Sequence, residues 1–177
     1  MLAEIEGQWS LDDAGNVTYQ RIVELGGLSK NEIYSRGLNY FLYDTENAPQ
    51  ELTEDKELGR IVAKGFFDNV HSSSVFLDYT NFHCLNLIRI DAKEGRARIL
   101  LTLTGYETEV GDASNNPPFI GTTKLSQEFP INPSGRSKTM MGKAFYNSHL
   151  KALETLERLA KAINDGNTST ILENDDW

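Results

Sequence analysis

The sequence predicts an α+β protein built around an antiparallel sheet. Three observations support this fold class: alternating apolar and polar positions in several strand-length segments, a capped amphipathic helix early in the chain, and a long amphipathic helix late in it. The chain has 177 residues, of which 39% are hydrophobic, enough for one globular domain with a substantial core. We expect a single domain over residues 1–166 and a polar tail over 167–177.

The first strand and helix are predicted from turn and capping signals. A turn-forming stretch at residues 12–16 precedes a strand that runs from about Val17 to Leu25, and two glycines then end it. Ser29 followed by Glu32 is the capping-box pattern, in which two backbone N–H groups gain partners, so a helix is expected to begin there. Its apolar residues recur at helical spacing, at Ile33, Tyr34, Leu38, Phe41 and Leu42.

The middle of the chain predicts a charged loop followed by strands. Residues 44–57 are strongly acidic and contain Pro49, which predicts an exposed loop. Alternation resumes at Gly59 and predicts a strand, after which the serines at 72–74 are interpreted as a solvated turn. Segments 82–91 and 96–106 then form a hairpin around a turn at 92–95. Its second strand has a core face with Ala97, Ile99, Leu101 and Leu103, and a wet face with Arg96, Arg98, Thr102 and Thr104.

The last third of the chain combines an irregular segment with the clearest helix. The Pro- and Asn-rich segment 107–135 predicts a long loop around a short apolar piece at 119–125. After it, apolar residues recur at spacings of three and four, so we expect one long amphipathic helix that ends at Gly166. The stripe comprises Met141, Phe145, His149, Ala152, Leu156, Leu159 and Ile163.

Composition excludes several classes of partner and site. The formal net charge of -9 disfavours binding to nucleic-acid phosphates and to anionic lipid surfaces. No apolar run approaches the roughly 20 residues that span a bilayer. Cys84 is the one cysteine, so the chain can form neither an internal disulfide nor a thiolate zinc site with several cysteine ligands.

Four stretches together resemble a known family. They are the strand that ends in two glycines, the helix LSKNEIYSRGLNYF, the segment EDKELGRIVAKGFF, and the hairpin LNLIRIDAKEGRARILLTL. Over residues 16–106 the chain resembles a family of exported bacterial proteins, a domain of unknown function with a TATA-binding-protein-like (TBP-like) fold. The most specific parts are Glu54–Gly65 and the turn Lys93–Arg98. The stretch after Tyr106 does not match.

The resemblance implies a fold and a location, and no activity. It implies a curved antiparallel sheet with helices packed on one face. It also implies a secreted, periplasmic or outer-membrane-anchored protein whose export signal is not part of this sequence. The family has no assigned catalytic or cofactor-binding residues, so none carry over.

The histidines and the cysteine favour structural roles. His83 and Cys84 are neighbours on a strand and therefore point to opposite faces, so they cannot act as a nucleophile and base pair. Cys84 is expected to be buried and unreactive. His149 lies on the apolar stripe of the last helix, where a core histidine is favoured over a metal ligand. His71 precedes three serines, without the flanking glycines of a nucleophile elbow.

The charged and glycine-containing stretches favour solvated surfaces and turns. Residues 44–57 lack the spacing that folds oxygen ligands around a calcium ion. The acidic tail group would lose conformational entropy if it closed on a metal ion. The remaining candidates are interpreted as turn formers, glycines without a nucleotide fingerprint, and tail carboxylates: Asp12, Asp13, Asn16, Gly26, Gly27, Gly37, Glu173, Asp175 and Asp176.

The last helix is locally basic in an acidic protein. Its cations could dock an acidic partner or lipid head groups. The favoured interpretation is a solvated face that complements the acidic remainder of the protein. These cations are Arg136, Lys138, Lys143, Lys151, Arg158 and Lys161, set against Glu154 and Glu157.

Two functional hypotheses follow from the sequence, and neither assigns a catalytic, cofactor-binding or metal-binding residue. The leading one is a non-enzymatic cell-envelope module that binds an unknown protein or small molecule through the sheet or the segment after Tyr106. The alternative is a hydrolase that uses carboxylates brought together by the fold to act on a carbohydrate or other small substrate. A concave pocket holding two carboxylates with raised pKa values would favour the alternative.

Overall fold

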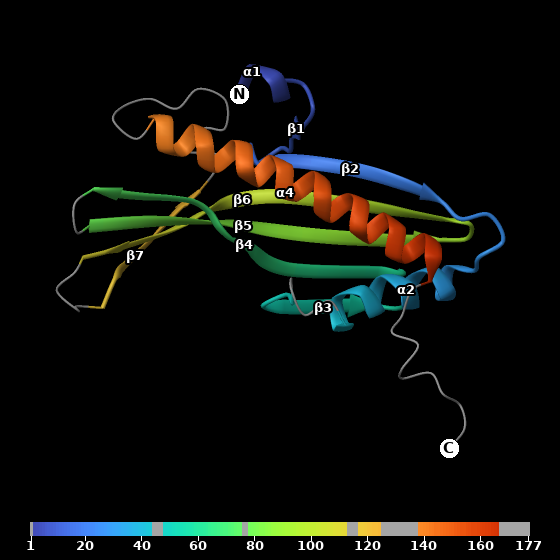
Figure 1. The fold of residues 1–177 in the computed structure, drawn as a ribbon. Helices are drawn as coiled ribbons and strands as arrows, with labels where there is room; N and C mark the ends of the chain where they lie inside the picture. Colours follow the sequence, from blue (N-terminus) through green and yellow to red (C-terminus); the bar gives the residue numbers. More distant parts are fainter. Residues whose placement is uncertain (1, 44–47, 76–77, 113–116, 125–137, 167–177) are drawn as a thin grey trace. The chain divides into compact units, whose positions relative to one another are not determined.

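The structure, a computed structural model, describes residues 2–43, 48–75, 78–112, 117–124 and 138–166. This part of the chain contains three helices and seven strands, which are labelled in Figure 1. In chain order they are α1 (Leu2–Ile5), β1 (Ser10–Leu11), β2 (Val17–Glu24), α2 (Lys30–Tyr43), β3 (Glu51–Asp55), β4 (Arg60–Val75), β5 (Asp78–Lys93), β6 (Arg96–Gly111), β7 (Phe119–Lys124) and α4 (Lys138–Asp165).

The strands form one antiparallel sheet of seven strands. Their order is β1-β2-β6-β5-β4-β3, and β7 also pairs with β6. β3 pairs with β4 so that Asp55 lies opposite Arg60, and β7 pairs with β6 so that Phe119 lies opposite Val110. The predicted α+β class, with an antiparallel sheet and a long C-terminal helix, is therefore confirmed.

The chain clusters into two compact units. Unit 1 comprises Met1–Tyr19, Phe66–Leu87 and Thr102–Leu153. Unit 2 comprises Gln20–Gly65, Ile88–Leu101 and Glu154–Trp177. Several elements contribute residues to both units, and each unit has a hydrophobic core of its own.

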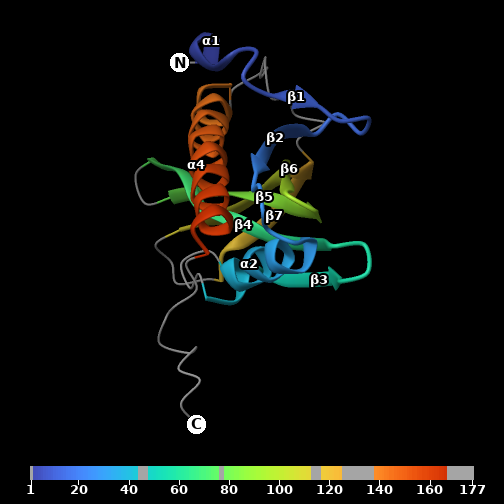
Figure 2. The ribbon, with the colours of Figure 1, turned by 90° about the vertical axis from the view of Figure 1, so that its right-hand side faces the viewer.

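In unit 2 the helix α2 packs on the sheet. The core contains Ile33 of α2 together with Ile61 and Ile90 of the strands, all fully buried. Gly37 allows this close approach, because a Cβ atom there would lie 3.1 Å from Cδ1 of Ile90. The predicted cap is present, since the Ser29 hydroxyl oxygen accepts a hydrogen bond from the Glu32 backbone N–H at 3.2 Å. Figure 2 shows α2 beside β3, as in Figure 1.

In unit 1 the first half of α4 packs on the sheet. Phe145 of α4 is 1% exposed, and Val17, Cys84 and Leu103 of the strands are fully buried. Trp9 adds an edge-to-face contact with Phe145, with ring centroids 5.9 Å apart. The whole apolar stripe predicted for α4 is buried, as expected.

The end of α4 is fixed by α2 and by a glycine. The Arg36 guanidinium donates hydrogen bonds to the carbonyl oxygens of Ile163 at 3.0 Å and Asn164 at 2.7 Å. Carbonyl groups in the last turn of a helix lack an N–H partner within the helix. The arginine supplies the missing hydrogen-bond donors. Gly166 follows with a positive φ of 66°, and the helix ends where predicted.

Three predictions of loop or turn are wrong at particular residues. The acidic stretch contains the edge strand β3, whose charged side chains are tolerated because most of them lie at the surface. The serines at 72–74 continue the strand β4, because backbone pairing needs no apolar side chain. The irregular segment 107–135 contains the end of β6 and all of β7. The residues at 125–135 and the tail at 167–177 lie outside the described part.

Candidate functional site

Cys84 and His83 point to opposite faces of the sheet, as predicted for neighbours on a strand. Cys84 is fully buried in unit 1, and burial raises the pKa of its thiol to about 12. His83 is held by groups on the other face of β5: its Nδ1 lies 2.6 Å from the Asp68 carboxylate. The burial and the opposite faces are confirmed, and the low reactivity of Cys84 stays a prediction.

His149 is a core residue, as predicted. It is 1% exposed, and its Nδ1 shares a hydrogen bond of 3.0 Å with the hydroxyl group of Tyr19. Burial lowers the pKa of His149 and raises the pKa of Tyr19. Both groups are therefore neutral at pH 7. Their hydrogen bond gives each of these two buried polar atoms a partner.

His71 and the serines after it form no nucleophile and base pair. His71 stacks on Phe82, with ring centroids 6.1 Å apart, and burial lowers the pKa of its imidazole. The Ser72 hydroxyl instead lies 2.6 Å from the side-chain oxygen of Asn69 and 2.8 Å from that of Asn81. These contacts are those of a polar strand surface.

The acidic candidates behave as turn and surface groups where they are described. One Asp12 carboxylate oxygen accepts hydrogen bonds from the backbone N–H groups of Ala14 at 3.0 Å and Asn16 at 2.8 Å. Within the described ranges, no group of three or more His, Cys, Asp or Glu side chains could hold a metal ion. Glu173, Asp175 and Asp176 lie outside those ranges.

Three lysines of the basic helix α4 lie at the surface. Lys143, Lys151 and Lys161 are exposed, whereas Arg158 is half-buried. Glu157 of the same helix pairs with Arg21 of β2 inside unit 2. Arg136 lies outside the described residues.

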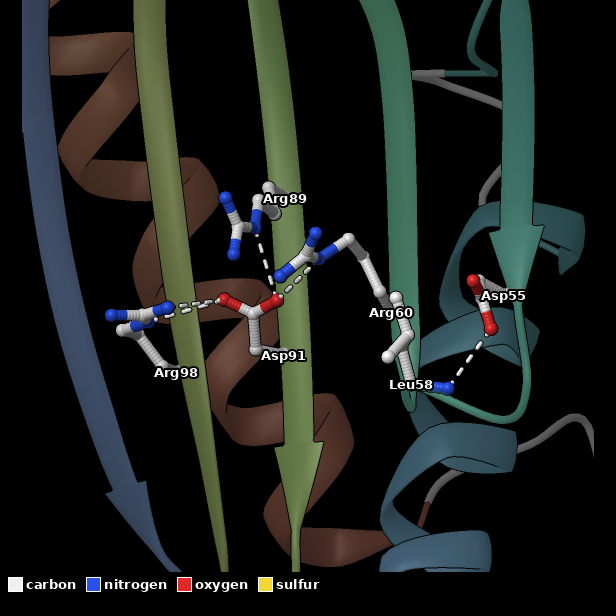
Figure 3. A network of polar contacts seen from close by, with 6 residues as sticks. All are labelled: Asp55, Leu58, Arg60, Arg89, Asp91 and Arg98. Atoms are coloured by element: carbon white, nitrogen blue, oxygen red, sulfur yellow. Dashed lines mark hydrogen bonds and ion pairs between the residues drawn. The ribbon is translucent and has the colours of Figure 1, made fainter.

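A cluster of three arginines around Asp91, on the face of unit 2 that lies away from α2, was not predicted. Asp91 of β5 accepts hydrogen bonds from β4, from β5 itself and from β6 (Figure 3). Its Oδ1 atom lies 2.8 Å from Nε of Arg60 and 3.0 Å from Nε of Arg89. Its Oδ2 atom lies 3.1 Å from Nε and 2.7 Å from Nη2 of Arg98.

Asp91 is the partly buried centre of this arginine cluster. Its side chain is 11% exposed, whereas those of the arginines are 31% to 46% exposed. Burial alone would raise the pKa of Asp91, but hydrogen bonds from Arg89, Arg60 and Arg98 outweigh it and lower the pKa to about 2. The carboxylate thus stays ionised and orients three guanidinium groups whose outer N–H groups face solvent.

The arginine cluster keeps an excess of positive charge. Three guanidinium groups surround one carboxylate, which leaves a charge of about +2 at neutral pH. Asp55 lies opposite Arg60 in the strand register, yet its Oδ1 accepts a hydrogen bond from the Leu58 backbone N–H at 2.9 Å (Figure 3). The structure gives it no ion pair with Arg60. A positive site therefore lies on a protein whose net charge is -9.

A cavity opens beside the arginine cluster in unit 2. It has a volume of about 210 Å³ and is lined by Ile22, Asp91, Lys93, Arg96, Ala97 and Arg98. Its lining therefore includes three cations and one carboxylate that already accepts three arginines. Such an arrangement can bind an anionic group by charge-assisted hydrogen bonds.

The sequence signal for this site was partial. Arg96 and Arg98 were placed on the wet face of their strand, and the hairpin turn fixes their register against Asp91. Arg60 could not be found in this way, because the serines at 72–74 predict a turn, whereas β4 runs on to Val75 and pairs with β5, which begins at Asp78. The three arginines meet at one carboxylate because the consecutive strands β4, β5 and β6 are neighbours in the sheet.

The fold and the cluster together define an α+β domain with an open antiparallel sheet and a basic polar site on it. The family's sequence model matches residues 19–107, half of the chain. The chain belongs to the family described as a domain of unknown function (DUF4468) with TBP-like fold. No curated protein matches the chain.

Two solved structures share this fold. One is a TBP-like protein from Parabacteroides distasonis, with a TM-score of 0.58, 15% sequence identity, and coverage of 87% of this chain and 96% of that one. The other is a DUF4468 family protein from Bacteroides ovatus, with a TM-score of 0.58, 17% identity, and coverage of 89% and 91%. Identities this low establish the fold alone. The predicted TBP-like family and fold are confirmed.

None of the helices within the described ranges combines the length and the apolar character needed to cross a membrane.

Proposed function

We propose that this protein is a non-enzymatic binding module for ligands that carry anionic groups. It binds them on the face of unit 2 that lies away from α2. The arginine cluster, formed by Arg60, Arg89 and Arg98 around Asp91, is the binding site. The proposal rests on the Asp91 carboxylate, which is only 11% exposed and holds three half-exposed guanidinium groups in place. A cluster that is oriented before binding loses less conformational entropy when a ligand arrives.

The charge distribution supports the proposal. In a protein with a net charge of -9, general electrostatics repels anions, so binding of an anion needs a local cationic site. Arginine suits this role because its planar guanidinium forms paired hydrogen bonds with carboxylate and phosphate groups. The alternative hydrolase has no comparable support, because the described carboxyl groups with shifted pKa values, Asp12 and Asp91, both have lowered values.

The cell-envelope location remains part of the proposal. It rests on the family resemblance, and a fractionation of the native bacterium, with an antibody against this protein, tests it. Recovery in the periplasmic or outer-membrane fraction is expected, and recovery in the cytoplasm alone would contradict the envelope role.

Titration with a short acidic peptide tests the binding activity. Hexaglutamate is a suitable probe, because a protein of net charge -9 attracts it only through a local site. We expect saturable binding by calorimetry at low salt, weakening as salt is raised. The double variant Arg60→Gln, Arg89→Gln should reduce affinity by about tenfold or more, since two charge-assisted contacts are lost.

A matched variant separates site effects from net charge. Lys151→Gln, Lys161→Gln removes the same two positive charges from exposed positions on α4. It should change hexaglutamate affinity by less than about twofold. If this variant weakens binding as much as the arginine pair does, the arginine cluster is not the site. Arg98→Gln alone provides a second test, should the double variant fold poorly.

A further inference from the structure

The cavity next to the arginine cluster identifies a class of ligand. We propose that it binds a small organic dianion, held by Lys93, Arg96 and Arg98 and packed through its aliphatic part against Ile22. This inference rests on the proposed function, because it places one anionic ligand at the same face of unit 2.

Two of the cavity cations have no acidic partner among the residues that the structure describes. Lys93 and Arg96 are both exposed, and neither forms an ion pair with any described residue. The neighbouring carboxylate of Glu94 is directed elsewhere, since it accepts a hydrogen bond from the Lys30 backbone N–H at 3.1 Å. Arg98 completes the set through the N–H groups that do not contact Asp91.

The charge of the lining favours a ligand with two negative charges. Three cations and one carboxylate give the cavity lining a charge of about +2 at neutral pH. A dianion compensates this charge, whereas a monoanion leaves part of it uncompensated. Phosphate monoesters and dicarboxylates share the required chemistry, and arginine forks bind both groups.

The size and the apolar wall restrict the rest of the ligand. The cavity volume of about 210 Å³ falls below the roughly 300 to 1,000 Å³ of typical ligand pockets, so the ligand must be small. Ile22 is 52% exposed at its rim, which leaves an aliphatic surface for a short carbon chain. Contact with such a chain would remove apolar area from water and favour an organic dianion over an inorganic one.

Four probe ligands distinguish the effects of the ligand's charge, its type of anionic group and its apolar chain. Calorimetry with propyl phosphate, succinate, inorganic phosphate and the monoanion propyl sulfate uses the full chain. We expect propyl phosphate or succinate to bind, and whichever binds more tightly identifies the class. Propyl sulfate should bind about tenfold more weakly than propyl phosphate, since it carries one charge fewer.

Variants assign the binding to this cavity. Lys93→Gln, Arg96→Gln should weaken dianion binding by about tenfold, whereas Lys151→Gln, Lys161→Gln should leave it within about twofold. Ile22→Ser should lower affinity for propyl phosphate by about threefold and leave inorganic phosphate unchanged. Binding of propyl sulfate as tight as that of the tighter-binding dianion, or equal loss in both double variants, would overturn the proposal.

Comparison of hexaglutamate with the dianions distinguishes failure of the cavity proposal from failure of the proposed function. If hexaglutamate binds through Arg60 and Arg89 while none of the dianions binds at millimolar concentration, the cavity proposal is wrong and the proposed function stands. If neither hexaglutamate nor the dianions bind, both are wrong.

Discussion

The strands of this protein carry two polar clusters with opposite charge. In unit 2, three arginines surround the single carboxylate of Asp91. In unit 1, the imidazole of His83 lies between two carboxylates, with Nδ1 2.6 Å from Asp68 and Nε2 3.8 Å from Glu109. Tyr79 donates a further hydrogen bond to Glu109 at 2.9 Å. The first cluster has an excess of cations and the second an excess of carboxylates.

The difference shows how burial of the central group determines the role of a cluster. Asp91 is 11% exposed and cannot leave its arginines without losing several hydrogen bonds. Asp68 is 74% exposed, so water competes for it and its pair with His83 contributes little to stability. We therefore interpret the unit 1 cluster as a polar strand surface and the unit 2 cluster as an organised site.

The largest expected effect comes from the core that supports the arginine cluster. Leu156 of α4 is 5% exposed in unit 2, so Leu156→Ala should lower the free energy of unfolding by about 2 to 5 kcal/mol. The exposed Lys151→Ala should be close to neutral. Urea melts of both variants provide the measurement, and equal stability would show that the stripe does not anchor the helix.

The next largest effect is expected at the centre of the arginine cluster. Asp91→Asn removes the charge that orients three arginines and should lower the free energy of unfolding by about 2 kcal/mol at pH 7. Denaturant melts of the variant and the wild type provide the measurement. A loss below about 0.5 kcal/mol would mean that the three hydrogen-bonded pairs contribute no net stability.

The same contribution should depend on pH with a defined sign. The pKa of Asp91 is lowered from 3.8 to about 2, so its stabilising contribution is present above pH 4 and is lost as the pH falls toward 2. The stability gap between wild type and Asp91→Asn should therefore close over that window. A gap that is constant from pH 7 to pH 2 would contradict the assigned pKa.

The smallest effect is expected in unit 1. Asp68→Asn should change the free energy of unfolding by less than about 0.5 kcal/mol, because an exposed pair gains little over water. Melts recorded beside those of Asp91→Asn compare two single-charge removals in one protein. If Asp68→Asn is the more destabilising of the two, the contrast between the clusters is wrong.

Much of the fold could be predicted because its signals are local. The apolar stripe from Met141 to Ile163 defines α4 through its helical period, and the glycine after it sets the end. The alternation around Ala97 and Ile99 separates a core face from a wet face on β6. These patterns need only neighbouring residues, so they can be detected in one sequence.

The strand segments that the sequence did not reveal are polar, so their pairing with the next strand along the chain leaves no apolar alternation. Nothing in the acidic segment 51–55 alternates clearly, and β3 exists because β4 provides backbone partners for it. The serines at 72–74 belong to β4 for the same kind of reason. The arginine cluster depends on two strand pairings at once, because Arg60 and Arg98 meet Asp91 from β4 and β6, on either side of β5.

Anion binding by the arginine cluster can be observed at the arginine side chains themselves. The Nε–Hε signals of Arg60, Arg89 and Arg98 can be followed by NMR during a titration with hexaglutamate, with the imidazole signals of His83 as the internal comparison. We expect saturable shifts at the three arginines, with His83 unchanged. Shifts at His83 alone, or no saturable shift at any of the three arginines, would contradict it.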